Sequence, residues 1–152
     1  MNKEIKIILG LILLILVGYA IFSSSEKVPE QNQEILEEIT YDRASTDLIV
    51  VELPFPGAVT GKGFSVIGRA RGYWFFEASF PITVLDKDGK VLVETYATAQ
   101  GEWMTEDFVP FKGDVKIPES YIGPATLILR KDNASGLPEH DASISFPFII
   151  EY

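Results

Sequence analysis

The sequence predicts an all-β fold, an antiparallel β-sandwich of about seven strands, preceded by one N-terminal transmembrane helix. Three observations predict this arrangement. An uncharged apolar run follows the first lysines, which is typical of a membrane anchor. From residue 47 onward, short apolar runs alternate with Pro, Gly, Asp and Asn, the residues that favour turns. Within several of these runs, apolar and polar residues alternate with a period of two, as in strands that bury one face.

Residues 1–22 are predicted to be a membrane anchor. They begin with two lysines and then carry no charge from Ile7 to Phe22. This run is about sixteen residues long, slightly shorter than the roughly 20 that a spanning helix prefers. A signal peptide has the same layout, and Gly18 and Ala20 form a weak cleavage motif. The segment is therefore a transmembrane helix or an uncleaved signal, with cleavage and a buried core helix as the alternatives.

Residues 23–46 are predicted to form a polar, acidic linker, because Glu, Gln, Asn and Ser dominate this range and large apolar residues are few. The lysines before the apolar run and the acidic residues after it predict a single-pass protein of the cell membrane. In this orientation the N-terminus is cytoplasmic and the C-terminal domain is extracellular.

The composition excludes several classes of function. The chain of 152 residues carries a formal net charge of -9 and contains no cysteine. An acidic surface repels phosphate, so we expect no nucleic-acid binding. The absence of cysteine excludes disulfides, thiolate metal sites, thiol catalysis and lipid attachment through cysteine. We also expect no small-molecule cofactor.

Residues 47–152 are predicted to form the β domain. Pro and Gly between the apolar runs make a long helix implausible, and DKDG is a strong hairpin-turn sequence. The predicted strands are 47–54, 64–70, 71–84, 90–99, 113–118, 125–132 and 142–150.

The aromatic stretch at residues 71–84, RGYWFFEASFPITV, is predicted to be a core strand. A period of two places an apolar set on one face: Trp74, Phe76, Ala78, Phe80, Ile82 and Val84. A similar set occurs near the C-terminus: Ile144, Phe146, Phe148 and Ile150. Both sets are expected to be buried. Tyr73 and Phe75 fall on the opposite face and are the candidates for exposed aromatic contacts.

The order of short motifs from about Leu48 to Tyr152 resembles the GerM-associated immunoglobulin-like domain of bacterial spore germination. The resemblance is carried by Pro-x-Pro-Gly at Pro54 to Gly57, by the segment from GRA to FEA, and by the hairpin sequence DKDGKVL. It implies an immunoglobulin-like β-sandwich on a membrane-attached or exported bacterial protein. It also implies no established enzymatic role.

The loop sequence GEWMTEDF is the candidate binding site. Trp103 and Met104 precede Glu106 and Asp107 in a segment without strand periodicity. A large aromatic side chain on a loop at the end of a sandwich is suited to contact a partner. The alternative is that Trp103 folds back to cap the open end of the core.

Two further features are assigned mainly structural roles. His140 is the only histidine, and neighbouring Glu and Asp residues on one loop do not form a catalytic triad. Asp86 and Asp88 resemble the start of a calcium loop, but the distal glutamate of a full loop is absent. A hairpin turn explains the same residues. Calcium bridging this turn to Asp132 or Asp141 is the less favoured alternative.

We therefore expect a membrane-anchored, externally exposed immunoglobulin-like module that binds an envelope protein or a wall polymer, with a link to spore germination and no enzymatic activity. Two other classes stay open. A secreted or anchored β-sandwich protease inhibitor would need a rigid, protruding loop. An envelope hydrolase would need clustered catalytic groups.

Overall fold

The structure, a computed structural model, describes residues 38–152. The predicted anchor at 1–22 and most of the predicted linker lie outside the described residues. The described part is all-β, as predicted, with two short 3₁₀ helices, η1 (Gly72–Trp74) and η2 (Pro138–His140). No helix within residues 38–152 is long and apolar enough to cross a membrane.

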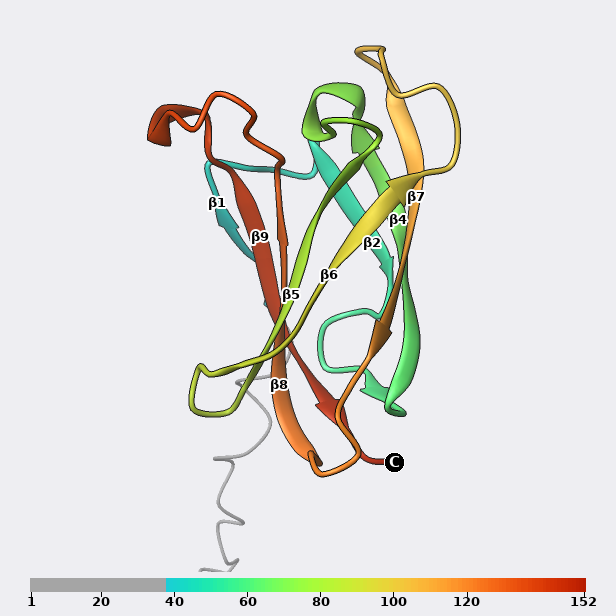
Figure 1. The fold of residues 1–152 in the computed structure, drawn as a ribbon, viewed down its shortest axis with the longest axis vertical. Coiled ribbons are helices and arrows are strands. Elements are labelled where there is room, and N and C mark those ends of the chain that lie inside the picture. Colours follow the sequence, from blue (N-terminus) through green and yellow to red (C-terminus); the bar gives the residue numbers. More distant parts are fainter. Residues whose placement is uncertain (1–37) are drawn as a thin grey trace, which may run out of the picture. The chain divides into compact units, whose positions relative to one another are not determined.

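In the described part of the chain, nine strands join into one curled sheet (Figure 1). In chain order they are β1 (Thr40–Asp42), β2 (Ile49–Leu53), β3 (Val59–Thr60), β4 (Gly63–Arg71), β5 (Ser79–Asp86), β6 (Val91–Ala99), β7 (Phe108–Lys116), β8 (Gly123–Arg130) and β9 (Ser143–Ile150). The spatial order is β1-β9-β8-β5-β6-β7-β4-β2, with β3 also on β9. All pairs are antiparallel except β3 with β9.

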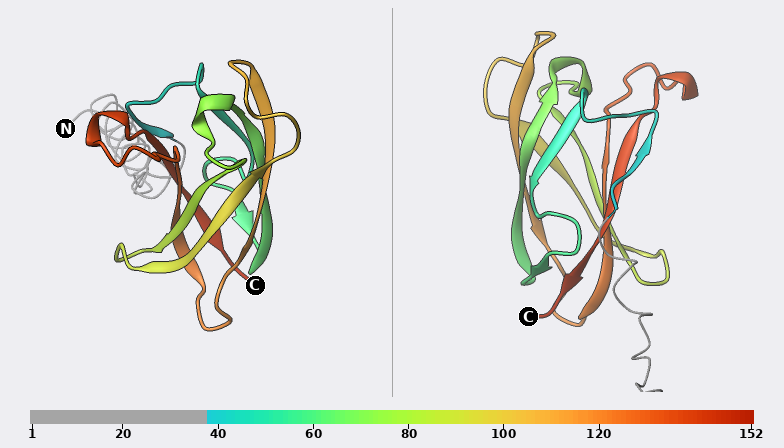
Figure 2. Two further views of the ribbon diagram at one scale, coloured as in Figure 1. Left: turned by 45° about the horizontal axis from the view of Figure 1, so that its top comes forward. Right: turned by 180° about the vertical axis from the view of Figure 1, so that it is seen from behind.

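The sheet curls into two facing layers because β6 crosses from one to the other (Figure 2). Strand β6 pairs with β5 from Val91 to Thr98, but it pairs with β7 only through Thr98 and Ala99. The strand directions diverge beyond this short contact. One layer therefore contains β1, β9, β8 and β5, and the other contains β7, β4 and β2.

Two of the nine strands have no counterpart among the predicted ones. Strand β1 lies in the range predicted as linker, yet Thr40, Tyr41 and Asp42 pair with β9. The residues before Arg43 favour a strand locally, but three residues are too few to show a period of two. Strand β3 has only two residues. The hydrogen-bonded domain thus begins at Thr40.

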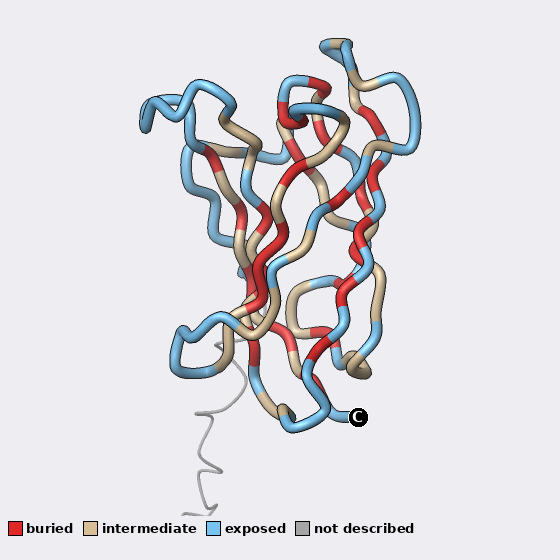
Figure 3. The backbone as a smooth tube through the Cα atoms, viewed as in Figure 1, coloured by how far each residue is buried: buried red, intermediate tan, exposed pale blue. Residues whose placement is uncertain are grey.

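The core lies between the two layers, and buried positions alternate with exposed ones along the strands (Figure 3). Trp74, Phe80, Phe146 and Phe148 are fully buried, as predicted. Phe80 is the central aromatic residue, since its ring lies 4.9 Å from the ring of Phe111 in an edge-to-face arrangement. The rings of Phe75 and Trp74 lie 5.2 and 6.4 Å from it. These contacts join η1 to both layers.

The prediction of one continuous strand over residues 71–84 is wrong, and it inverts two aromatic residues. Phe76, expected in the core, is 45% exposed, whereas Phe75, a candidate for exposed contacts, is 3% exposed. Strand β4 ends at Arg71, and a tight turn follows in which Phe76 and Ser79 exchange two backbone hydrogen bonds of 3.0 Å. The backbone passes through positive φ at 77 and 78 (47° and 61°). Such turns favour Asn and Gly, so the Glu-Ala pair carried no turn signal.

Replacing Phe80 by Ala is expected to lower the free energy of unfolding by about 3–5 kcal/mol, because the change removes a fully buried ring and leaves a cavity. Phe76→Ala is the matched control and should change it by about half a kcal/mol or less. Chemical denaturation of both variants measures the two values. Equal losses would contradict the assignment of the two side chains.

Candidate functional site

Loops gather at two ends of the curled sheet (Figure 1). One end, here the β6–β7 end, carries η1 and the connections at 100–107 and 131–142. The opposite end carries the hairpin turn at 87–90 and the connection at 117–122. Two hydrogen bonds tie the loops of the β6–β7 end together: Gly72 N–H donates to the Asp107 carbonyl (3.1 Å), and Asp132 N–H donates to the Trp74 carbonyl (3.0 Å).

The loop with the predicted site residues lies directly on η1. A Cβ atom at Gly72 would come within 2.0 Å of the Thr105 carbonyl oxygen and 2.3 Å of the Trp103 carbonyl oxygen, so only glycine permits this approach. Trp103 is partly buried and packs against the core. Met104, by contrast, is 74% exposed. The two residues thus differ in environment, with Trp103 packed against the core and Met104 open to solvent.

The structure brings most of the predicted site residues to this one end. Tyr73 and Met104 are exposed there with Glu106 and Asp107, whereas Phe75 is not part of this surface because it lies in the core. Phe76 is exposed in its place. The β6–β7 end therefore presents apolar side chains beside carboxylates, an arrangement that fits a basic or amphipathic partner.

An apolar groove lies away from the β6–β7 end. The end of β2, the connection at 54–58, β3 and the first residues of β4 form it. Its volume is about 360 Å³. Phe55 is 60% exposed, and Leu53 and Val59 are half-exposed. The groove is lined by Leu53, Pro54, Phe55, Ala58, Val59, Thr60, Gly61, Phe64, Ser65 and Ile67. Its volume lies at the lower end of the range of ligand pockets, and its apolar lining is of the kind found at interaction sites.

The connection that presents Phe55 is held in place at both ends. Pro54 and Pro56 restrict the backbone on either side of Phe55. Gly57 adopts a positive φ of 75°, and its N–H donates to the Pro147 carbonyl of β9 (2.8 Å). The Ala58 carbonyl accepts the Ile149 N–H (2.9 Å). These bonds attach the end of the connection to β9.

The sequence pattern does not reveal this groove. In the sequence, PFPG ends a predicted strand and belongs to the motif that carries the family resemblance. The available signal was the position of Phe55 between two prolines. Neither proline can donate a backbone hydrogen bond inside a sheet, so this segment is expected to be a connection and not a strand. A rigid loop cannot readily withdraw such a side chain into the core.

Fixed charges border the groove on the outer face of β4 and β7. The Ser65 hydroxyl donates to Asp114 Oδ1 (2.6 Å), and Lys112 Nζ lies 3.2 Å from the same oxygen. The hydrogen bond from Ser65, together with the contact from Lys112, lowers the pKa of the Asp114 carboxyl below its ordinary value. Next to this group, Arg69 forms an ion pair with Glu52 (3.0 Å). The apolar groove thus has a polar, charged rim.

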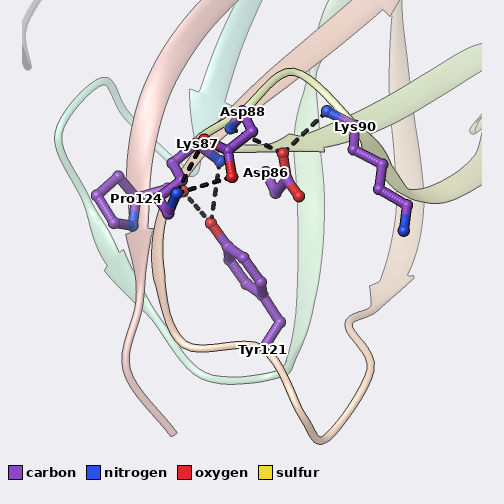
Figure 4. Close-up of polar contacts among 6 residues, drawn as sticks. All are labelled: Asp86, Lys87, Asp88, Lys90, Tyr121 and Pro124. Carbon is purple, nitrogen blue, oxygen red and sulfur yellow. Dashed lines mark hydrogen bonds and ion pairs between the residues drawn. The ribbon is translucent and has the colours of Figure 1, made fainter.

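The DKDG sequence forms the predicted hairpin turn (Figure 4). Asp86 Oδ1 accepts the N–H groups of Asp88 (2.8 Å) and Lys90 (2.9 Å). The bond from Lys90 is the main cause that lowers the pKa of Asp86. Asp88 forms an ion pair with the Lys87 ammonium (2.7 Å), and the Lys87 N–H donates to the Tyr121 hydroxyl (3.2 Å).

The alternative of a calcium ion bridging this turn to Asp132 or Asp141 is wrong. In the β5–β8 register, Asp86 lies opposite Ala125 at one end, while β8 runs toward Asp132 at the other end. Within residues 38–152, no three His, Asp or Glu side chains are grouped to hold a metal ion. His140 is exposed in η2, and its backbone carbonyl accepts a hydrogen bond from the Lys131 ammonium (3.4 Å).

Comparison with protein families finds a match over residues 48–136, more than half of the chain, to the immunoglobulin-like domain of bacterial spore germination. Among solved structures, the crystal structure of CopC from Methylosinus trichosporium OB3b is similar, with 21% sequence identity and a TM-score of 0.44. That similarity covers 68% of this chain and 92% of the CopC chain. No curated protein matches the sequence.

Trp103→Ala is expected to lower the free energy of unfolding by about 1–3 kcal/mol, because Trp103 is partly buried against the core. Met104→Ala, the neighbouring control, should have almost no effect on stability. Thermal melts of the two variants test the difference. If Trp103→Ala melts like the unmodified chain, Trp103 does not cap the core.

Proposed function

The chain belongs to the family of immunoglobulin-like domains of bacterial spore germination, and on this premise we propose that it is a non-enzymatic, membrane-anchored module that binds an envelope protein. The domain is exposed outside the cell and takes part in spore germination as a recognition element. The single observation that carries the binding role is the apolar groove beside Phe55.

The chemistry of the groove favours a protein partner. Leu53, Phe55 and Val59 present apolar surface to solvent, and covering such surface is favourable by roughly 25 cal/mol per Å². A wall polysaccharide is hydrophilic and would gain little there. An apolar side chain of a protein fills such a groove, while the charged rim around Asp114 and Arg69 supplies polar contacts.

The anchor accounts for the place at which the module acts. The apolar run up to Phe22 supports a single-pass topology with a cytoplasmic N-terminus. Seventeen residues (23–39) separate it from Thr40, and an extended chain of that length would span at most about 60 Å. The domain is thereby kept within reach of membrane proteins and of the inner part of the wall.

The β6–β7 end is a second candidate contact surface, because Met104, Tyr73 and Phe76 are exposed there. Its carboxylates suit a basic or amphipathic partner. Two other functions compete with recognition. A protease inhibitor would block a protease on mixing, and an envelope hydrolase would release products from wall fragments. Either result in a direct assay would replace the binding proposal.

If the groove is the binding site, residue 55 should contact the partner protein. A photo-crosslinking phenylalanine analogue at Phe55, in the full-length chain in its native membrane, should capture one envelope protein. The same analogue at Tyr96, which is equally exposed on β6, is the control. With the captured protein purified, Phe55→Ala should weaken binding by about 1 kcal/mol or more, as at a hot spot. Equal capture from both positions would contradict the groove as the binding site.

The anchor predicts that the mature protein keeps residues 1–22 and fractionates with membranes. Mass spectrometry of the purified protein should recover the intact N-terminal peptide, because the cleavage motif at Gly18 and Ala20 is weak. A mature terminus near Ile21 or Glu26 would show that the segment is a cleaved signal.

A further inference from the structure

A second, polar pocket of about 240 Å³ lies where β1, β8 and β9 come together at the β6–β7 end of the sheet. The residues that line it are Asp42, Arg43, Arg130, Lys131, Asp141, Ala142 and Ser143. In the strand register Ser143 lies between Asp42 and Arg130, so these three side chains share one face. About 20 Å of β9 separates this pocket from the apolar groove, at ~3.3 Å per residue.

Three basic side chains and two carboxylates line the pocket, so basic groups are in excess by one. Arg43 stands on the β1 side, with Arg130 and Lys131 on the β8 side. Arg43 lies 3.7 Å from the Asp42 carboxylate. Within residues 38–152, neither Arg130 nor Lys131 forms an ion pair. Arg130 and Lys131 thus line the cavity without an ion pair inside the described residues, although the carboxylates of Asp42 and Asp141 line the same cavity.

The Arg130 side chain is held in place by a neutral partner. Arg130 Nη1 donates to the hydroxyl of Thr83 (2.7 Å), a buried residue of β5. This single bond leaves the other N–H groups of the guanidinium for a ligand. Lys131 Nζ makes one long contact to the His140 carbonyl (3.4 Å). The Arg130 side is therefore ordered by a bond that does not neutralise its charge.

The opposite side of the pocket is also fixed. Arg43 has a positive φ of 49°, and its guanidinium donates to the Pro138 carbonyl of η2. The Asn133 side-chain amide donates to Asp141 Oδ1 (2.8 Å) and to the Leu137 carbonyl (2.8 Å). These bonds join the end of β1 to the β8–β9 connection. A pocket whose walls are already ordered loses little conformational entropy when it binds a ligand.

We propose that this pocket binds an oxyanion, a phosphate or a carboxylate, carried on a small hydrophilic unit of a bacterial wall polymer. The planar guanidinium of Arg130 suits two parallel hydrogen bonds to such a group, and the Lys131 ammonium adds a point charge. The Ser143 hydroxyl, on the strand beside Arg130, lines the same pocket and can donate a third bond. The volume holds one anionic unit, so the polymer runs past the pocket and only the unit enters it. This site is separate from the groove and extends the proposed function to a second ligand.

The test is a titration of the full-length chain, in nanodiscs of neutral phosphatidylcholine, with three small probes. Glycerol 1-phosphate represents a phosphate-bearing polymer, N-acetyl-D-alanine represents the carboxylate of a wall peptide, and glycerol is the neutral control. Isothermal titration calorimetry at low salt should detect binding of at least one anion and none of glycerol. Affinity should fall as salt rises, because the interaction is ionic.

Variants separate a site from general charge attraction. Lys131→Gln and Arg130→Gln should each weaken binding by about tenfold, which is about 1.4 kcal/mol. Lys116→Gln, which removes an equal charge from the end of β7, should leave affinity within about twofold. Lys131→Gln keeps the Arg130–Thr83 bond, so it tests the site even if Arg130→Gln unfolds.

Two results would overturn the proposal. One is the absence of binding by both anions, and the other is an equal loss in the Lys116→Gln variant. The stronger of the two anions identifies the source as phosphate or wall-peptide carboxylate. Crosslinking from residue 55 should be unchanged in Lys131→Gln, so failure of this site and failure of the groove are told apart.

Discussion

Strand β9 is the element on which the rest of the structure depends, because it pairs along both of its edges. One edge carries β8 in an antiparallel register from Ser143 to Ile150. The other edge carries β1 at its beginning and β3 at its end. The connection from β2 returns to β9 through the bonds of Gly57 and Ala58. The chain thereby closes the open side of the curled sheet. A curled sheet without this connection would expose the outer edge of β9, and exposed edges invite pairing with other chains.

The apolar groove and the polar pocket are both built on that same outer edge. The groove exists because the connection that carries Phe55 is fastened beside Pro147 and Ile149 of β9. The polar pocket exists because β1 lies beside Ser143 and brings Arg43 opposite Lys131. One edge of one strand thus positions the apolar groove at one end and the polar pocket at the other. The two proposed ligands, a protein at the groove and an anionic unit at the pocket, would therefore not compete for the same surface.

Most of the regular strands could be predicted from the sequence, although β7 begins at Phe108, five residues before the predicted strand, and the irregular connections could not be predicted. Alternation identified the buried faces around Phe80 and Phe146, because a period of two reports burial wherever a strand is regular. Alternation failed at Phe75 and Phe76. There a turn at Glu77 and Ala78 interrupts the period of two, and the turn contains no Gly or Asn from which it could be predicted. The site was harder to predict for the same reason. Phe55 is exposed by a loop whose position depends on a strand about ninety residues later, and such a contact leaves no local pattern.

Residue-resolved amide hydrogen exchange of the full-length chain tests the role of the β9 edge most directly. The amide of Gly57 lies in a loop, and loop amides ordinarily exchange fast. If the 2.8 Å bond to the Pro147 carbonyl holds the connection on β9, the Gly57 amide should exchange as slowly as that of Ile149, and both should open only with the whole domain. Fast exchange at Gly57 beside slow exchange in β9 would contradict the account, because the groove would then have no fixed wall.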